Sequence, residues 1–348
     1  MSYTVSSSEK LRKKGADTET KALLHLMVHG PNNDDIYYFV VDFFNDLTGL
    51  NKDATELWDV QSKGTKNATA TAIGRELVTL FKNYVSQIKF HHYILFIDSV
   101  TDTLRKDNNN LMFGVSNIKP KQLEKIKIGL IDECKSKEYV DDIKITNKNI
   151  DDFLREVIFV VGNGKDGGAC VLDVIKHHTT LTPTEEVLQA IFNEIRNVQS
   201  NKKNQNVEGV VIDRPDEALN YGRHLTYNEI YLLILQRILT YNPLDKRAPL
   251  SFVEEIKHCP PEEKRRLIEG CQASIARVLF DKNSSEGFWN LFNIIVRIIN
   301  DKKYNSISKI YLELHKIIKW NECCPQFDAL SLKYFIALVK DGVDNYEN

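Results

Sequence analysis

Short apolar runs rich in β-branched and aromatic residues occur in the first half of the chain, between segments with helical periodicity. Residues 92–100 (HYILFIDSV), 127–131 (KIGLI) and 157–161 (VIFVV) are such runs. Each predicts a strand buried on both faces, and such strands occur in sheets that are covered by helices. Residues 71–90 predict one covering helix, because their apolar side chains recur every three to four positions. The first half of the chain is therefore predicted to be an α/β domain.

The second half has a different pattern, in which almost every segment predicts a helix. One helix is predicted over residues 183–199, and beyond residue 206 the predicted helices cover residues 228–239, 251–258, 261–279, 287–299, 306–319 and 330–339. A polar stretch, SNKKNQN at residues 200–206, separates the two patterns. We therefore predict an α/β domain over residues 1–200 and an all-α domain over residues 207–348.

Composition excludes several classes of protein. Apolar residues make up 42% of the chain and charged residues 27%, as in a globular protein with a substantial core. No apolar run reaches the ~18 residues of a membrane span, and the N-terminus lacks the apolar stretch of a secretory signal. The six cysteines form no C-x-x-C motif, which favours free thiols in a reducing compartment. We therefore expect a cytoplasmic protein without a membrane partner.

The sequence WDVQSKG at residues 58–64 is the strongest candidate for a chemical site. On a strand, alternation places Asp59, Gln61 and Lys63 on one face. A carboxylate or amide oxygen can help to hold Mg²⁺, and a nearby lysine can stabilise charge on a phosphate during cleavage. The pattern therefore indicates metal-dependent phosphodiester cleavage, provided that a neighbouring strand supplies another carboxylate.

Asp46 is placed to supply that carboxylate. If residues 39–49 form a strand and residues 50–54 the hairpin turn, Asp46 lies beside Gln61, with Asp42 on the same face. The Tyr, Phe and Val content of residues 36–44 favours a strand. A helix over residues 35–50 is the competing interpretation, because apolar side chains also recur there at helical spacing. In that case Asp42 or Asp59 would have to replace Asp46 as the metal ligand.

The segments FVVDFFNDLT and LWDVQSKG resemble the PD-(D/E)xK nucleases, the restriction-endonuclease-like superfamily. They look most like the Cap4-type nuclease domains of bacterial anti-phage effectors, which occur in Lamassu-like or cyclic-oligonucleotide-linked systems. The resemblance implies a restriction-endonuclease-like domain, with a mixed sheet flanked by helices. It also implies that Asp46 is the metal-binding aspartate, that Gln61 is a second ligand through its amide oxygen, and that Lys63 is the catalytic lysine. The metal would be Mg²⁺, with Mn²⁺ able to substitute.

The function that follows is a metal-dependent DNA endonuclease with little sequence specificity, acting as an effector of prokaryotic anti-phage defence. The formal charge of −2 gives no global sign of a nucleic-acid partner, so DNA would contact a local basic site, for which Lys66 is the candidate. The motif leaves RNA open as a substrate. The alternative is a non-catalytic, partner-binding scaffold on a decayed nuclease fold. A neutral Gln61 ligand predicts weak metal binding.

Three other features have simpler interpretations. The loop VVGNGKDGG at residues 160–168 lacks the G-K-[ST] of a nucleotide site, so we expect only a tight turn after a strand. Glu76, on the helix behind the proposed site, is expected to be exposed with an i-to-i+4 charge partner on its own helix, although some nucleases take an extra carboxylate from such a helix. An apolar stripe on the predicted helix 287–299 indicates either an internal helical core or an interface with partner subunits of a defence complex or a second copy of the chain.

Overall fold

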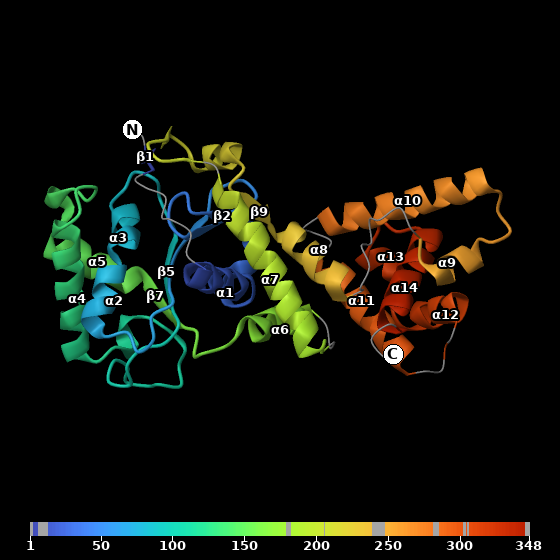
Figure 1. The fold of residues 1–348 in the computed structure, drawn as a ribbon, viewed down its shortest axis with the longest axis horizontal. Coiled ribbons are helices and arrows are strands. Elements are labelled where there is room, and N and C mark those ends of the chain that lie inside the picture. Colours follow the sequence, from blue (N-terminus) through green and yellow to red (C-terminus); the bar gives the residue numbers. More distant parts are fainter. Residues whose placement is uncertain are drawn as a thin grey trace. The chain divides into compact units, whose positions relative to one another are not determined.

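The computed structural model describes residues 3–5, 13–178, 182–204, 206–238, 248–280, 285–301, 304 and 306–344. The chain divides into two compact units. Unit 1 comprises residues 1–170 and 192–226, and unit 2 comprises residues 171–191 and 227–348. Unit 1 contains the main sheet with its helices, whereas unit 2 is helical (Figure 1). The expected order of an α/β part followed by an all-helical part is therefore confirmed. The division into domains 1–200 and 207–348 remains a prediction.

The sheet of unit 1 has seven strands in the order β6-β7-β5-β4-β3-β2-β9. Their bounds are β2 (Ile36–Val41), β3 (Leu47–Asn51), β4 (Leu57–Lys63), β5 (His92–Ile97), β6 (Met112–Phe113), β7 (Val157–Val161) and β9 (His224–Thr226). Strands β4, β5 and β7 are mutually parallel, and every other pairing is antiparallel. The sheet is therefore mixed. A small second sheet pairs β1 (Tyr3–Thr4) with β8 (Val211–Ile212).

Helices cover both faces of the sheet (Figure 1). The helices before β9 are α1 (Lys13–His29), α2 (Ala70–Glu76), α3 (Val78–Tyr84), α4 (Pro120–Lys135), α5 (Asn147–Glu156), α6 (Gly167–His178) and α7 (Glu185–Asn201). On one face, the Trp58 indole of β4 donates to the Pro31 carbonyl just after α1. On the other, the alternate β4 side chains Asp59 and Gln61 bond to α3. The predicted alternation of residues 58–63 is therefore confirmed, because Trp58 makes its contact on one face of β4 whereas Asp59 and Gln61 make theirs on the opposite face.

The predicted strand at residues 127–131 is wrong, because these residues lie in the middle of α4. Ile126, Leu130 and Cys134 are buried at four-residue spacing, so the apolar run is one turn of an amphipathic helix. Gly129 marks a close approach to α2, where a Cβ would meet the Thr71 carbonyl oxygen at 2.4 Å. A glycine inside a short apolar run thus marked helix packing rather than a strand.

The first hairpin differs from prediction in detail. A helix over residues 35–50 is wrong, because β2 and β3 pair as antiparallel strands here. The predicted single strand 39–49 is instead interrupted by a turn at residues 42–46. Asp42 begins that turn with a left-handed φ of 50°, a conformation that aspartate tolerates better than most residues. Its N–H donates to the Asp46 carbonyl at 3.1 Å, which closes the turn.

The predicted helix 71–90 is also wrong in detail, because it ends at Tyr84 and is divided into α2 and α3, which meet at Leu77. Leu77 is fully buried although it lies outside both helices. Leu77 separates the last residue of α2 from the first residue of α3. Glu76 therefore ends α2, and Thr79 lies in the first turn of α3.

Unit 2 is built from helices. The helices of this unit that follow β9 are α8 (Tyr227–Ile238), α9 (Leu250–Glu255), α10 (Pro261–Phe280), α11 (Ser285–Asn300), α12 (Ile307–Ile317), α13 (Trp320–Cys323) and α14 (Ala329–Asp344). The apolar stripe of α11 is buried, and its Phe288 and Phe292 pack on Phe335 of α14. The stripe thus forms an internal core, and a partner interface through these helices remains a prediction. Among the described helices, none is long and apolar enough to span a membrane.

Candidate functional site

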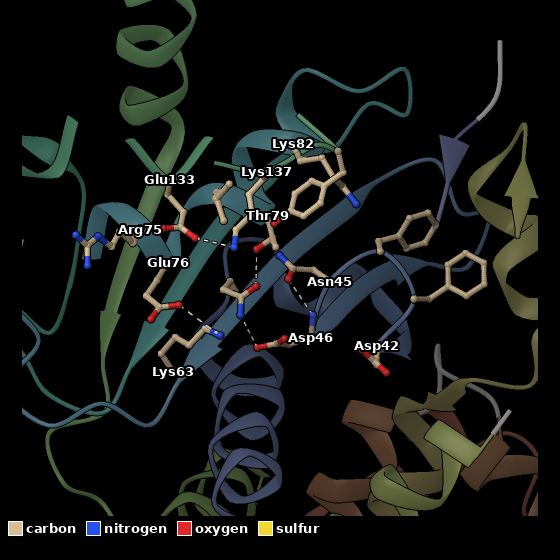
Figure 2. Close-up of a pocket in the computed structure, with 15 residues that line it drawn as sticks. Asp42, Asn45, Asp46, Lys63, Arg75, Glu76, Thr79, Lys82, Glu133 and Lys137 are labelled. Carbon is tan, nitrogen blue, oxygen red and sulfur yellow. Dashed lines mark hydrogen bonds and ion pairs between the residues drawn. The ribbon is translucent and has the colours of Figure 1, made fainter. Parts of the chain in front are cut away.

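A cavity of about 500 Å³ opens where the turn 42–46 meets β4, α2 and α3. Charged and polar side chains dominate its wall (Figure 2). The lining residues are Asp42, Phe43, Phe44, Asn45, Asp46, Gln61, Lys63, Arg75, Glu76, Val78, Thr79, Lys82, Glu133, Lys137 and Tyr139. The three residues singled out from sequence, Asp46, Gln61 and Lys63, are therefore brought together in one cavity.

Asp46 is held by three hydrogen bonds that converge on one oxygen. Its Oδ2 accepts from Gln61 Nε2 at 2.8 Å, from the Ser62 N–H at 2.9 Å and from Ser62 Oγ at 3.0 Å. Burial raises the pKa of Asp46, while the nearby charge of Lys63 and the Ser62 N–H act in the opposite direction. The carboxylate is therefore fixed in position but poorly solvated, so an added cation would be favourable there.

Gln61 bridges Asp46 to α3. Its Nε2 donates to Asp46, and its Oε1 accepts from Thr79 Oγ1 at 2.5 Å. The amide oxygen therefore points away from the carboxylate in this arrangement. A half-turn of the amide would place Oε1 beside Asp46 and Nε2 beside Thr79, whose hydroxyl can accept as well as donate. Gln61 thus becomes a ligand beside Asp46 only after that rotation.

The donor set fits a weakly held Mg²⁺. The carboxylate and the amide are hard oxygen donors, and Mg²⁺ is commonly bound by one or two carboxylates together with water and substrate phosphate. Within the described part of the chain, no group of three or more His, Cys, Asp or Glu side chains is arranged to hold a metal ion. A cation at Asp46 would therefore depend on water or substrate for most of its ligands.

Lys63 lies at the end of β4, where its Nζ is 3.4 Å from Glu76 Oε2 of α2 (Figure 2). The two side chains are 26% and 36% exposed, so the pair faces the open part of the cavity. The expectation that Glu76 would pair with a residue on its own helix is wrong. Helix α2 ends at Glu76, so the carboxylate reaches across to the strand instead.

Further cations line the cavity at Arg75, Lys82 and Lys137. Lys137 follows α4 and pairs with Glu133 at 2.9 Å. Lys66 is exposed and lies outside the lining, so its contact with DNA remains a prediction. Lys82 and Lys137 were not predicted as site residues, because no sequence pattern connects their elements with β4.

A buried polar network lies behind the cavity. The Asp59 carboxylate is fully buried and accepts from Asn83 Nδ2 at 2.8 Å. Tyr3 Oη donates to Asn83 Oδ1 at 2.9 Å and accepts from Lys82 Nζ at 2.8 Å. Asp59 therefore supports the wall rather than lining the cavity. Asp42 reaches the rim, where it forms an ion pair with Arg223.

Burial changes the protonation of this network. It raises the pKa of Asp59 to about 7 and lowers that of Lys82 to about 8. The unfolded chain ionises aspartate near its ordinary pKa of about 3.9. Between these values the folded state keeps a proton that the unfolded state has lost. The free energy of unfolding should therefore fall as the pH rises from about 4 to about 7.

We expect an Asp59→Asn variant to lack this dependence. Asparagine is neutral throughout and can still accept a hydrogen bond from Asn83. Urea unfolding of both proteins at pH 5 and pH 7.5 measures this difference. Between the two pH values, the free energy of unfolding of the wild type should fall by about 2 kcal/mol relative to that of the variant. Parallel pH profiles for the two proteins would contradict the raised pKa of Asp59.

Comparisons with known proteins give distant similarities only. No family model and no curated protein matches the chain. The structure of a Cap4 SAVED/CARF-domain containing receptor from Moraxella osloensis matches 66% of this chain and 48% of its own, with 13% identity and a TM-score of 0.37. An Acinetobacter baumannii Cap4 SAVED/CARF-domain containing receptor, solved with the cyclic trinucleotide 3'3'3'-cAAA, matches 66% and 46%, with 11% identity and a TM-score of 0.38. The chain thus spans about half the length of each receptor.

Proposed function

We propose that this protein is a metal-dependent endonuclease that hydrolyses phosphodiester bonds in DNA. The observation that carries the proposal is the convergence of Asp46, Gln61 and Lys63 on one polar cavity. Asp46 and Gln61 come from adjacent segments of a hairpin, and Lys63 follows Gln61 on the same face of β4. The restriction-endonuclease-like fold is part of the same proposal, and a mixed sheet with helices on both faces is consistent with it.

Each residue has a distinct task in the proposed reaction. Asp46 and the rotated amide of Gln61 would hold Mg²⁺, which when bound activates a water and polarises the phosphate. Lys63 would stabilise the negative charge that develops on the phosphate, because its ammonium group lies in the open part of the cavity. Glu76 would keep Lys63 extended towards the cavity before substrate enters. Ser62 and Thr79 would fix the orientations of the two metal ligands.

The remaining cations of the cavity suit a polyanionic substrate. Arg75, Lys82 and Lys137 can contact phosphates on either side of the cleaved bond. Phosphate contacts carry no sequence information, so cleavage with little sequence specificity follows. The chain as a whole is not basic, with a formal charge of −2, so phosphate contacts would depend on such local side chains. We also propose that the protein acts in anti-phage defence, and this role rests on the resemblance of FVVDFFNDLT and LWDVQSKG to Cap4-type nuclease domains.

The test is a cleavage assay with purified protein and supercoiled plasmid. We expect nicked and linear products in millimolar Mg²⁺ or Mn²⁺, and no products when EDTA is added. A single-stranded RNA of similar length in a parallel reaction decides between the two nucleic acids. Cleavage that persists in EDTA would overturn the metal-dependent mechanism, and preferential cleavage of the RNA would overturn DNA as the substrate. An intact plasmid under every metal condition would favour the non-catalytic scaffold.

A Gln61→Glu variant should bind divalent cations more tightly than the wild type. Without a cation, the new carboxylate would face Asp46 at the place where Nε2 now donates, so we expect a lower melting temperature in EDTA. With a cation, a second anionic ligand should lower the Mn²⁺ concentration for half-maximal thermal stabilisation at least about tenfold. Half-saturation of the wild type by low micromolar Mg²⁺ would contradict weak binding. Gln87→Glu, at an exposed position of unit 1, is the matched control.

A further inference from the structure

One aromatic side chain in the wall of the cavity is open to solvent. Tyr139, in the turn that follows α4, lines the cavity with Lys137 and is 39% exposed. Two other aromatic residues of the lining, Phe43 and Phe44, are each 3% exposed and pack on one another, with ring centroids 5.0 Å apart. Among the described residues of the lining, Tyr139 is therefore the aromatic side chain that a molecule in the cavity can reach.

Backbone contacts hold the turn that carries Tyr139. The Lys137 N–H donates to the Cys134 carbonyl at 3.1 Å, and the Val140 N–H donates to the Lys137 carbonyl at 3.2 Å. Cys134 and Val140 are both buried in the hydrophobic core of unit 1, so the turn is anchored on each side of Tyr139. The ring is thus presented from an ordered backbone, which reduces the entropy lost when a ligand packs on it.

The neighbouring cations distinguish Tyr139 from an ordinary exposed side chain. Isolated exposed apolar side chains are common on protein surfaces and need no explanation. Tyr139, however, lines a cavity of about 500 Å³ together with the cationic side chains of Lys63, Arg75, Lys82 and Lys137. Grooves that bind single-stranded nucleic acids combine the same two features, because cations follow the phosphates and aromatic rings stack on the bases. The cavity therefore offers a partner to each part of a nucleotide.

We propose that Tyr139 stacks on an unpaired base of the substrate strand, so that the cavity prefers DNA with unpaired bases to fully paired DNA. This inference rests on the proposed nuclease function and adds a substrate class to it. A base inside a duplex presents no free face until it leaves the stack. Every base has a face on which a ring can stack. Tyr139 therefore selects for the unpaired state of a strand and not for its sequence.

The test measures binding in EDTA, where metal-dependent cleavage does not occur. The probes are a fluorescently labelled single-stranded DNA of mixed sequence and the fully paired duplex that contains it, followed by fluorescence anisotropy. We expect the wild type to bind the single strand more tightly than the duplex. Tyr139→Ala should raise the Kd for the single strand at least about fivefold and leave the Kd for the duplex within about twofold. Equal affinities of Tyr139→Ala and the wild type for the single strand would overturn the proposal.

Ile143→Ala is the matched control. It removes an apolar side chain that is 82% exposed, lies four positions further on and is absent from the lining. Its affinity for the single strand should remain within about twofold of that of the wild type. Both substitutions are at exposed positions and should leave the fold intact.

An abasic strand of the same length separates stacking from charge, because it keeps the phosphates and lacks the bases. The wild type and Tyr139→Ala should bind it with equal affinity, whereas Tyr139→Trp should bind the natural strand at least as tightly as the wild type does. An equal loss of affinity on the natural and abasic strands would overturn stacking. Plasmid cleavage without any effect of Tyr139→Ala on strand binding would contradict this inference and leave the nuclease proposal standing. Tyr139-dependent strand binding without cleavage in any metal would support the inference and contradict the nuclease proposal.

Discussion

Replacing Lys63 with alanine should reduce plasmid cleavage by about a hundredfold to a thousandfold. Removal of one preorganised group that stabilises charge in a transition state typically has an effect of this size, about 2.7–4 kcal/mol. Lys63 is expected to act in this way because its ammonium lies on the same strand face as Gln61 and faces the open part of the cavity. Initial rates of nicking in Mg²⁺ and in Mn²⁺, at equal protein concentration, measure the loss.

The fold should tolerate this substitution. The Lys63–Glu76 pair is partly exposed, and pairs of this kind contribute at most about 1 kcal/mol to stability. The melting temperature of Lys63→Ala should therefore remain close to that of the wild type, which separates a chemical role from a structural one. Lys52→Ala changes an exposed lysine in the turn after β3 and should cleave at the wild-type rate. Equal rates for Lys63→Ala and the wild type would contradict the assignment of Lys63.

Replacing Asp46 with asparagine should reduce plasmid cleavage at least as much as Lys63→Ala does, by about a thousandfold or more. The site then loses its only proposed anionic ligand. The amide oxygen can still accept from Ser62, so the turn should keep its shape. Burial disfavours the charged form of Asp46 and raises its pKa. In the absence of a divalent cation, Asp46→Asn should therefore be at least as stable as the wild type.

The stability and the cation response of Asp46→Asn are measured together. In thermal unfolding without metal, the variant should melt at or above the wild-type temperature, and the stabilisation by Mn²⁺ should disappear. Asp53→Asn, at an exposed position of the same hairpin, should retain both cleavage and the Mn²⁺ response. Retention of the Mn²⁺ response in Asp46→Asn would exclude Asp46 as a ligand.

Local pattern was sufficient for part of this architecture. Alternation over residues 58–63 predicted which side chains share a face, since successive side chains of a strand point in opposite directions whatever packs on them. Strands β5 and β7 follow from short apolar runs, and the helices of unit 2 from their periodicity. The same reasoning failed at residues 127–131, because a run of five residues with three apolar side chains cannot distinguish a buried strand from one turn of a helix. The close approach of α4 to α2 at Gly129 resolved that ambiguity.

The sequence by itself determined that Asp59, Gln61 and Lys63 share one strand face and that the chain changes from mixed to helical structure. Only the tertiary structure decided what surrounds that face. Glu76 at the end of α2 pairs with Lys63, Thr79 of α3 bonds to Gln61, and Arg223 reaches Asp42 from beyond α7. These pairings join separate elements of the fold, and a buried charge depends on the partner that the fold brings to it. The spacing of residues along the chain carries no record of such partners.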